Sequence, residues 1–132
     1  MCVAVALIHI QDQGGFPGSK DPGYVAIGYY ALEATAALCA LFLLVPGPWL
    51  SRLVWPLAAG VAFGPMIGYV LSRGPGLPHY SDDKGNWTEP LGLLSLAVEL
   101  GLLLIAIRRT FYRPVEEVRT AQQPSPVRVS AE

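Results

Sequence analysis

The chain has 132 residues, of which 52% are hydrophobic and only 14% are charged, whereas about 25% are charged in a typical soluble domain. A net charge of −1 excludes the basic surface that nucleic-acid binding needs, and two cysteines are too few for a disulfide-stabilised secreted scaffold. The mean hydropathy of +0.41 therefore indicates an integral membrane protein in contact with the lipid bilayer.

The first eleven residues are almost wholly apolar but too short to cross a bilayer as a helix. The segment has no basic region at its start, so a normal signal peptide is not expected. It is either the end of a span that starts further upstream or a short helix that dips into the bilayer beside its neighbours. We predict a partial N-terminal helix over residues 1–11 and, with three full spans, a four-helix arrangement.

Three longer apolar runs approach the roughly 30 Å thickness of the hydrocarbon core: 25–45, 53–71 and 91–107. The first run follows Asp21 and Pro22, a favourable N-cap and first turn, and ends at a Pro-Gly-Pro stop. We therefore predict an all-α membrane protein, a small transmembrane helical bundle. Its full spans are expected over 22–45, 49–72 and 88–109, the last with Thr88 or Glu89 as N-cap.

Positive charge is unevenly distributed between the two sides of this bundle. The turn after the first full span carries Arg52 and five arginines follow the last span, whereas the opposite loops hold only Lys20, Arg73 and Lys84. Short loops rich in Lys and Arg stay in the cytoplasm. We therefore predict a multi-pass protein of the cell membrane with a cytoplasmic C-terminus. Residues 114–132 are polar and contain prolines, which predicts a disordered cytoplasmic tail.

Two glutamates lie inside the predicted spans. Glu33 and Glu99 each lie eight positions after the start of an apolar run, so both are expected at about the same depth in the bilayer. A carboxyl group in hydrocarbon is costly, and no Lys or Arg occurs at that depth, so at least one is expected to be protonated if the two are close. The pair could share a proton, hold a cation, or accept hydrogen bonds from Tyr29 or Tyr30. The simpler interpretation is two protonated acids that join helices.

Small residues form a regular pattern in the middle span. Gly60, Gly64 and Gly68 are spaced by four residues, which places them on one face of a helix. Such a face lets another helix approach closely, and Pro65 beside it predicts a kink. We interpret this glycine stripe as a helix-packing face, and a transporter hinge is the alternative.

A second polar set is expected at the outer surface. His9 and Asp12 are three residues apart and share a helix face. The 79–89 loop adds four further candidates: His79, Asp82, Asp83 and Glu89. Histidine with carboxylates is a plausible set for a divalent metal ion, although the spacing matches no closed metal motif. The alternative interpretation of this loop is a solvent-exposed turn that precedes a helix.

The segments DPGYVAIGYYALE (21–33) and GNWTEPLGLLSLAVE (85–99) each end in one of the intramembrane glutamates. In these segments the chain resembles uncharacterised small multi-pass integral membrane proteins of actinobacterial type, over most of residues 9–109. The resemblance implies a four-helix membrane fold. It implies no activity, and it assigns no functional residue to this chain.

The loops are too short for a soluble catalytic domain, and the spans hold few polar groups. We therefore predict a non-enzymatic accessory or structural subunit, which packs through small-residue faces in a homo-oligomer or against other membrane subunits. The first alternative is a proton- or cation-handling protein that uses Glu33 and Glu99. The second is a metal-binding component of a membrane enzyme that uses His9, Asp12 and the 79–89 loop.

Overall fold

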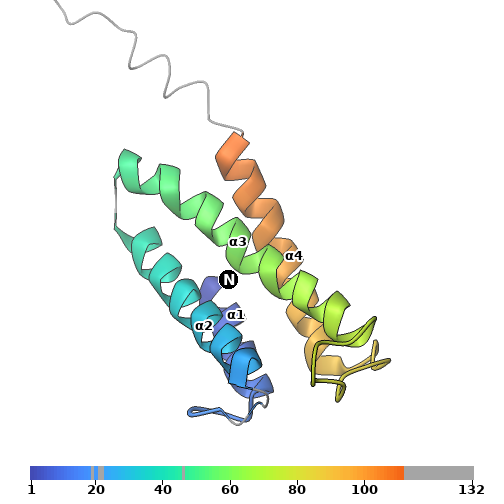
Figure 1. Ribbon diagram of the computed structural model, residues 1–132. Helices are drawn as coiled ribbons and strands as arrows, with labels where there is room; N and C mark the ends of the chain where they lie inside the picture. Colours follow the sequence, from blue (N-terminus) through green and yellow to red (C-terminus); the bar gives the residue numbers. More distant parts are fainter. Residues whose placement is uncertain (19, 21–22, 46, 112–132) are drawn as a thin grey trace, which may run out of the picture.

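The computed structural model describes residues 1–18, 20, 23–45 and 47–111. The described residues form no β-strand and four α-helices (Figure 1): α1 (Cys2–Asp12), α2 (Gly23–Leu44), α3 (Pro48–Arg73) and α4 (Pro90–Phe111). The predicted helical bundle of three full spans and a shorter N-terminal helix is confirmed. The predicted N-cap at 21–22 and the predicted tail 114–132 lie outside the described residues.

Prolines mark the starts of the last two helices. α3 begins at Pro48, where the missing N–H removes a donor that would have no partner inside the helix. α4 begins at Pro90, and the Glu89 carbonyl oxygen accepts the Leu93 N–H at 3.0 Å. Glu89 therefore occupies the N-cap position, and it is one of the two residues predicted for that role.

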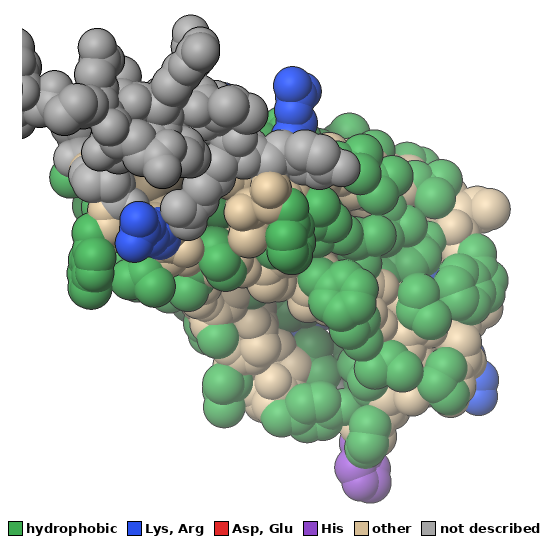
Figure 2. Space-filling view, turned by 90° about the horizontal axis from the view of Figure 1, so that it is seen from above, with side chains coloured by type: hydrophobic (Ala, Val, Ile, Leu, Met, Phe, Trp, Pro, Cys, Tyr) green, Lys and Arg blue, Asp and Glu red, His purple; other side chains and the backbone are tan. Residues whose placement is uncertain are grey.

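The helices α2, α3 and α4 are each long and apolar enough to cross a membrane. Large hydrophobic side chains point away from the bundle rather than into it, and one face is largely hydrophobic in the space-filling view (Figure 2). Examples on the outside of the three long helices are Leu41, Leu53 and Leu104. Such a surface is stable in lipid and unfavourable in water, so the chain has the character of a membrane protein.

The bundle has two distinct ends (Figure 1). The segments 13–18 and 74–89 lie at the same end of the bundle, which we call the loop end, and the end of α2, the start of α3 and the end of α4 lie at the opposite end, the turn end. α3 packs on α4, α1 packs on α2, and α2 packs on α3. The short helix α1 also contacts α4, which closes the bundle.

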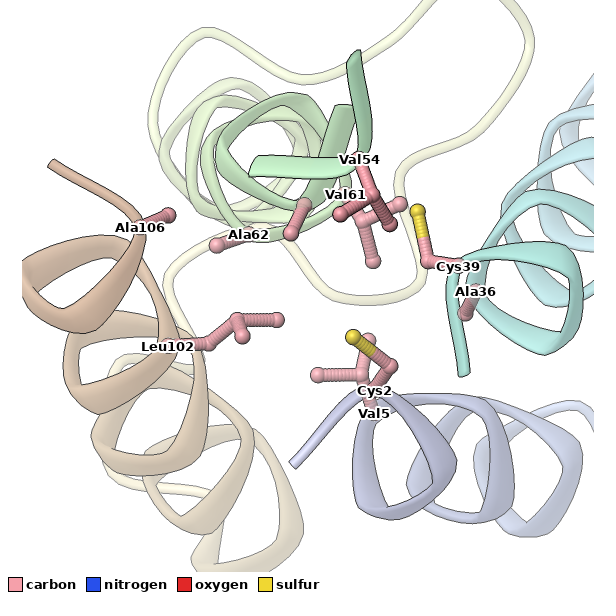
Figure 3. Packing of buried hydrophobic residues seen from close by; sticks show 10 residues of the cluster. Cys2, Val5, Ala36, Cys39, Val54, Val61, Ala62, Leu102 and Ala106 are labelled. Carbon is pink, nitrogen blue, oxygen red and sulfur yellow. The ribbon is translucent and has the colours of Figure 1, made fainter. Parts of the chain in front are cut away.

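Small side chains form the core of the turn-end half (Figure 3): Cys2, Val5, Ala36, Cys39, Val54, Ala58, Val61, Ala62, Leu102 and Ala106. All four helices contribute to this cluster. Because small residues let helix backbones approach closely, the packing here is by shape and van der Waals contact. Both cysteines are buried free thiols.

Candidate functional site

Buried polar side chains gather in the loop-end half of the bundle: Gln13, Glu33, Ser72, Arg73, Ser95 and Glu99. They lie around or beside a cavity of about 390 Å³, which we call the loop-end cavity. All four helices and the 74–89 loop line this cavity, with polar groups from His9, Asp12, Tyr29, Arg73, Ser95 and Glu99.

Glu99 is the most deeply buried acid that lines the cavity, with only 1% of its surface exposed. Its Oε1 accepts a hydrogen bond from the Ser95 hydroxyl, one turn earlier in α4, at 2.5 Å. Ser95 and Glu99 are four residues apart and therefore share one face of α4. The other carboxyl oxygen, Oε2, has no hydrogen-bond partner among the described residues. A buried acceptor without a partner is unusual and calls for a donor.

His9 faces Glu99 from α1. Its Nδ1 lies 2.9 Å from the Val5 carbonyl oxygen, and because a carbonyl only accepts, Nδ1 carries the hydrogen. Nε2 then points to Glu99 Oε1 at 3.7 Å. The imidazole also packs against the Tyr29 ring, with centroids 5.6 Å apart. The separation between Nε2 and Oε1 is within the range of an ion pair and longer than a hydrogen bond.

Glu33 has different surroundings from Glu99. It is buried, and its Oε1 accepts a hydrogen bond from Gln13 Nε2 at 2.7 Å. It is not among the residues that line the loop-end cavity. Within the described part of the chain, no hydrogen bond joins Glu33 to Glu99, Tyr29 or Tyr30. The two glutamates therefore each have their own partner.

A network of polar contacts lies at the mouth of the cavity. Asp12 accepts a hydrogen bond from the Tyr29 hydroxyl and lies 3.5 Å from Lys20 Nζ. Lys20 also donates to the Tyr80 hydroxyl at 3.4 Å, and Tyr80 donates to Asp83 at 2.9 Å. Burial lowers the pKa of Lys20, but Asp12, Tyr80 and Asp83 outweigh it, so the pKa is raised above its ordinary value. Burial and the hydrogen bond to Asp83 raise the pKa of Tyr80.

Arg73 holds the 74–89 loop on the bundle. Its guanidinium lies 2.5 Å from Glu89, 3.6 Å from Asp83 and 4.0 Å from the centre of the Tyr69 ring, and only 7% of its surface is exposed. A Cβ at Gly92 would lie 2.7 Å from Tyr69 Cε2, so glycine lets α4 approach this stacked pair. The positive charge of Arg73 is therefore already engaged by carboxylates of its own loop.

The six candidate metal ligands divide among separate surroundings. His9 faces Glu99, and Asp12 pairs with Lys20. Asp83 and Glu89 both pair with Arg73. The remaining two, His79 and Asp82, are exposed. In the described ranges, no three His, Cys, Asp or Glu side chains are placed to hold a metal ion together.

His9 and Asp12 do share a helix face, because both contact Tyr29. His9 is largely buried, since only 12% of its side chain is exposed. The reason is that α1 packs against α4, so that this face of α1 turns toward Glu99.

The glycine stripe has open space around it within this chain. A Cβ at Gly60, Gly64 or Gly68 would meet nothing within 4 Å. Gly64 and Gly68 line the loop-end cavity, and Gly60 lines an apolar groove between α2 and α3. The stripe is therefore not a tight contact between helices of one molecule, and its role as a packing face toward another molecule stays a prediction.

Three residues of this region were not predicted as functional from the sequence. Gln13 was treated as part of a loop, and Lys20 and Arg73 were counted only as loop charges. For Arg73 the sequence does hold a signal, because an arginine that ends an apolar span is followed by a loop rich in Asp and Glu. For Gln13 no local pattern predicts the contact, since its partner Glu33 lies twenty positions away.

The arrangement places an imidazole and a carboxyl group together beside a cavity, and it leaves one carboxyl oxygen to accept a hydrogen bond from a donor. The chain matches no protein-family model, no curated protein and no solved structure. The functional argument is therefore made from the loop-end cavity and the residues around it.

Proposed function

We propose that this chain is a membrane protein that takes up and releases protons in the loop-end cavity, with Glu99 as the proton carrier and His9 as its partner. One observation carries this proposal: a carboxyl group that is 1% exposed lines a 390 Å³ cavity, 3.7 Å from an imidazole nitrogen. Ionisable residues in membrane helices normally mark substrate or proton paths, and histidines and acids form the relays.

The charges around Glu99 support the same role. A buried carboxylate is costly unless a cation or a proton compensates it. Among the described residues that line the cavity, the guanidinium of Arg73 is engaged by Asp83 and Glu89. Lys20 is held by Asp12 at the mouth. The proton on the His9–Glu99 pair is therefore the compensating charge, and a change in the cavity that adds or removes positive charge moves that proton.

We assign Glu33 a structural role in this proposal. Its carboxyl group is joined to Gln13 and lies outside the cavity lining, so its surroundings favour a fixed hydrogen bond between α2 and the end of α1. Glu33 is therefore the matched control for Glu99, because both are buried intramembrane glutamates.

Purified protein in liposomes with an internal pH-sensitive dye tests the proposal. We expect the wild type to dissipate an imposed pH gradient, and Glu99→Gln to reduce this flux to that of empty liposomes. Glu33→Gln should retain the wild-type flux. Size-exclusion chromatography of both variants checks that the bundle still assembles. Equal flux through the wild type and Glu99→Gln would contradict the proposal.

A second candidate is an accessory or structural subunit that packs through the glycine stripe. The supporting observation is that a Cβ at each of its three glycines meets nothing within 4 Å, so that another helix can approach there. We expect Gly60→Leu to reduce the mass of the particle extracted in mild detergent, since Gly60 is exposed and lies outside the cavity lining. The exposed Ala97→Leu is the control. An unchanged mass for Gly60→Leu would contradict this candidate.

We further propose that the chain lies in the cell membrane with its turn end in the cytoplasm, because the arginines concentrate there. A fluorescent protein fused to the C-terminus is then expected to mature and fluoresce, whereas an alkaline phosphatase fused there should be inactive. The reverse pattern would overturn this orientation.

A further inference from the structure

We infer that the loop-end cavity binds a small organic ammonium ion with an apolar body, whose N–H donates to Glu99 Oε2. This inference rests on the proposed function, because the same carboxyl group binds the proton and the ammonium ion in turn. It goes further in naming the chemical class of the ligand.

The size and walls of the cavity fit such a molecule. Its volume of about 390 Å³ lies within the roughly 300–1,000 Å³ of small-molecule pockets. Its apolar lining includes Val25, Leu32 and Leu91, and the rings of Tyr29 and Tyr69 also line it. These apolar side chains accept the hydrocarbon part of the ligand. An inorganic metal ion needs several oxygen or nitrogen ligands, and the described residues offer no group of three.

The charges of the lining favour a cation over an anion. Three carboxylates, from Asp12, Asp83 and Glu99, line the cavity against a single arginine. The guanidinium of Arg73 already pairs with Asp83 and Glu89, so its positive charge is compensated within the chain. Asp12 is likewise engaged by the Tyr29 hydroxyl and Lys20. Glu99 is the carboxyl of this set that keeps a buried oxygen without a partner.

The hydrogen bonds around Glu99 define what the ligand must offer. Ser95 donates to Oε1, and His9 faces the same oxygen, so that Oε2 is left to accept. An ammonium group supplies an N–H donor and a positive charge at once. A hydrocarbon of the same shape supplies only the apolar contact.

Binding of the ammonium ion is coupled to release of a proton. Before binding, the His9–Glu99 pair holds one proton; when the ammonium ion arrives, that proton leaves to solvent. The carboxylate and a neutral imidazole then face the bound cation, and no covalent bond to carbon forms or breaks. The site therefore exchanges one proton for one ammonium ion, and its net charge is conserved.

Isothermal titration of the purified protein with benzylamine, in phosphate and in Tris at the same pH, tests the inference. We expect saturable binding to one site and a difference between the two buffers that corresponds to about one proton released per benzylamine. Glu99→Gln should weaken benzylamine binding by about tenfold or more, because a hydrogen bond to a charged partner is lost. Ethylbenzene, the isostere that has neither the charge nor a donor, should not distinguish the wild type from Glu99→Gln, and Glu33→Gln should bind benzylamine like the wild type.

A second variant leaves the carboxyl group in place and fills the cavity instead. Gly68 lines the cavity and a Cβ there meets nothing within 4 Å, so Gly68→Leu is expected to fold and to lose benzylamine binding. Ala97→Leu, exposed on α4, should retain binding. The inference is overturned if the wild type, Glu99→Gln and Gly68→Leu bind benzylamine equally.

The two proposals fail in different ways. Proton flux that depends on Glu99, without benzylamine binding, would overturn the ligand class and leave the proposed function in place. Benzylamine binding that depends on Glu99, without proton release or flux, would support the ligand class and contradict the proposed function.

Discussion

The two halves of this bundle are built on different principles, although the same four helices form both. The turn-end half is built around a cluster of mostly small apolar side chains, and its stability depends on how closely their shapes fit. The loop-end half contains buried polar groups around a cavity, and its stability depends on paired hydrogen bonds. Two acceptors in this second half, Gln13 Oε1 and Glu99 Oε2, have no hydrogen-bond partner among the described residues, and only Glu99 lines the cavity. The contrast indicates that the turn end packs the helices together, whereas the loop end holds the polar groups on which the proposed function rests.

A single helix shows the change from one principle to the other. In α3, Ala58 and Ala62 are fully buried against the other helices. One turn or two later, Gly64 and Gly68 have open space where a side chain would lie, and both line the cavity. Residues of similar size therefore have opposite surroundings within a few turns.

The largest effect is expected at Arg73, because removing it leaves Asp83 and Glu89 without their cation. We expect Arg73→Met to lower the free energy of unfolding by about 3 kcal/mol, as measured by denaturant unfolding in detergent. Lys84→Met removes an exposed cation of the same loop and should change it by less than about 0.5 kcal/mol. Equal effects of the two variants would show that the loop end does not depend on this buried contact.

The contrast within α3 gives the next largest effect. Ala62→Leu adds three carbons to a site that is fully buried, so we expect a loss of about 1–3 kcal/mol from overpacking. Gly68→Leu enlarges a side chain where a Cβ meets nothing, and its stability should stay near that of the wild type. Unfolding of both variants in the same detergent compares them directly. A larger loss at Gly68 would contradict the division into a packed half and an open half.

A smaller loss is expected at the hydrogen bond between Gln13 and Glu33. Gln13→Leu leaves the buried carboxyl group of Glu33 without its donor, at a cost of about 1–2 kcal/mol. The matched control is Gln11→Leu, at an exposed position of α1. If both variants unfold at the same denaturant concentration, the contact contributes no stability to the loop-end half.

Local patterns in the sequence predict the helices and the shared faces, but not the partners across the bundle. The apolar runs predict three spans and a short first helix, and the four-residue spacing places Ser95 beside Glu99. The contact of His9 with Glu99 joins residues ninety positions apart, so it depends on how α1 packs on α4. A pattern within one helix carries no information on how that helix packs against the others. The sequence therefore does not predict the partners of the two glutamates outside their own helices, Gln13 for Glu33 and His9 for Glu99.

The smallest effect concerns Lys20, whose contact with Asp12 lies at the mouth of the cavity. Such half-exposed pairs contribute about 0.5 kcal/mol, so Lys20→Met should be only slightly less stable than the wild type at neutral pH. Because the folded state raises the pKa of Lys20, the contribution is complete below the ordinary lysine value of about 10.4 and is lost as the pH rises through the folded-state pKa. The raised pKa of Tyr80 has the same sign, since folding favours its protonated form. Thermal unfolding of the wild type and Lys20→Met from neutral to strongly alkaline pH should therefore show a difference that shrinks at the alkaline end. A difference that stays constant over this range would mean that the Lys20 charge contributes nothing, and that the loop end is held by Arg73 alone.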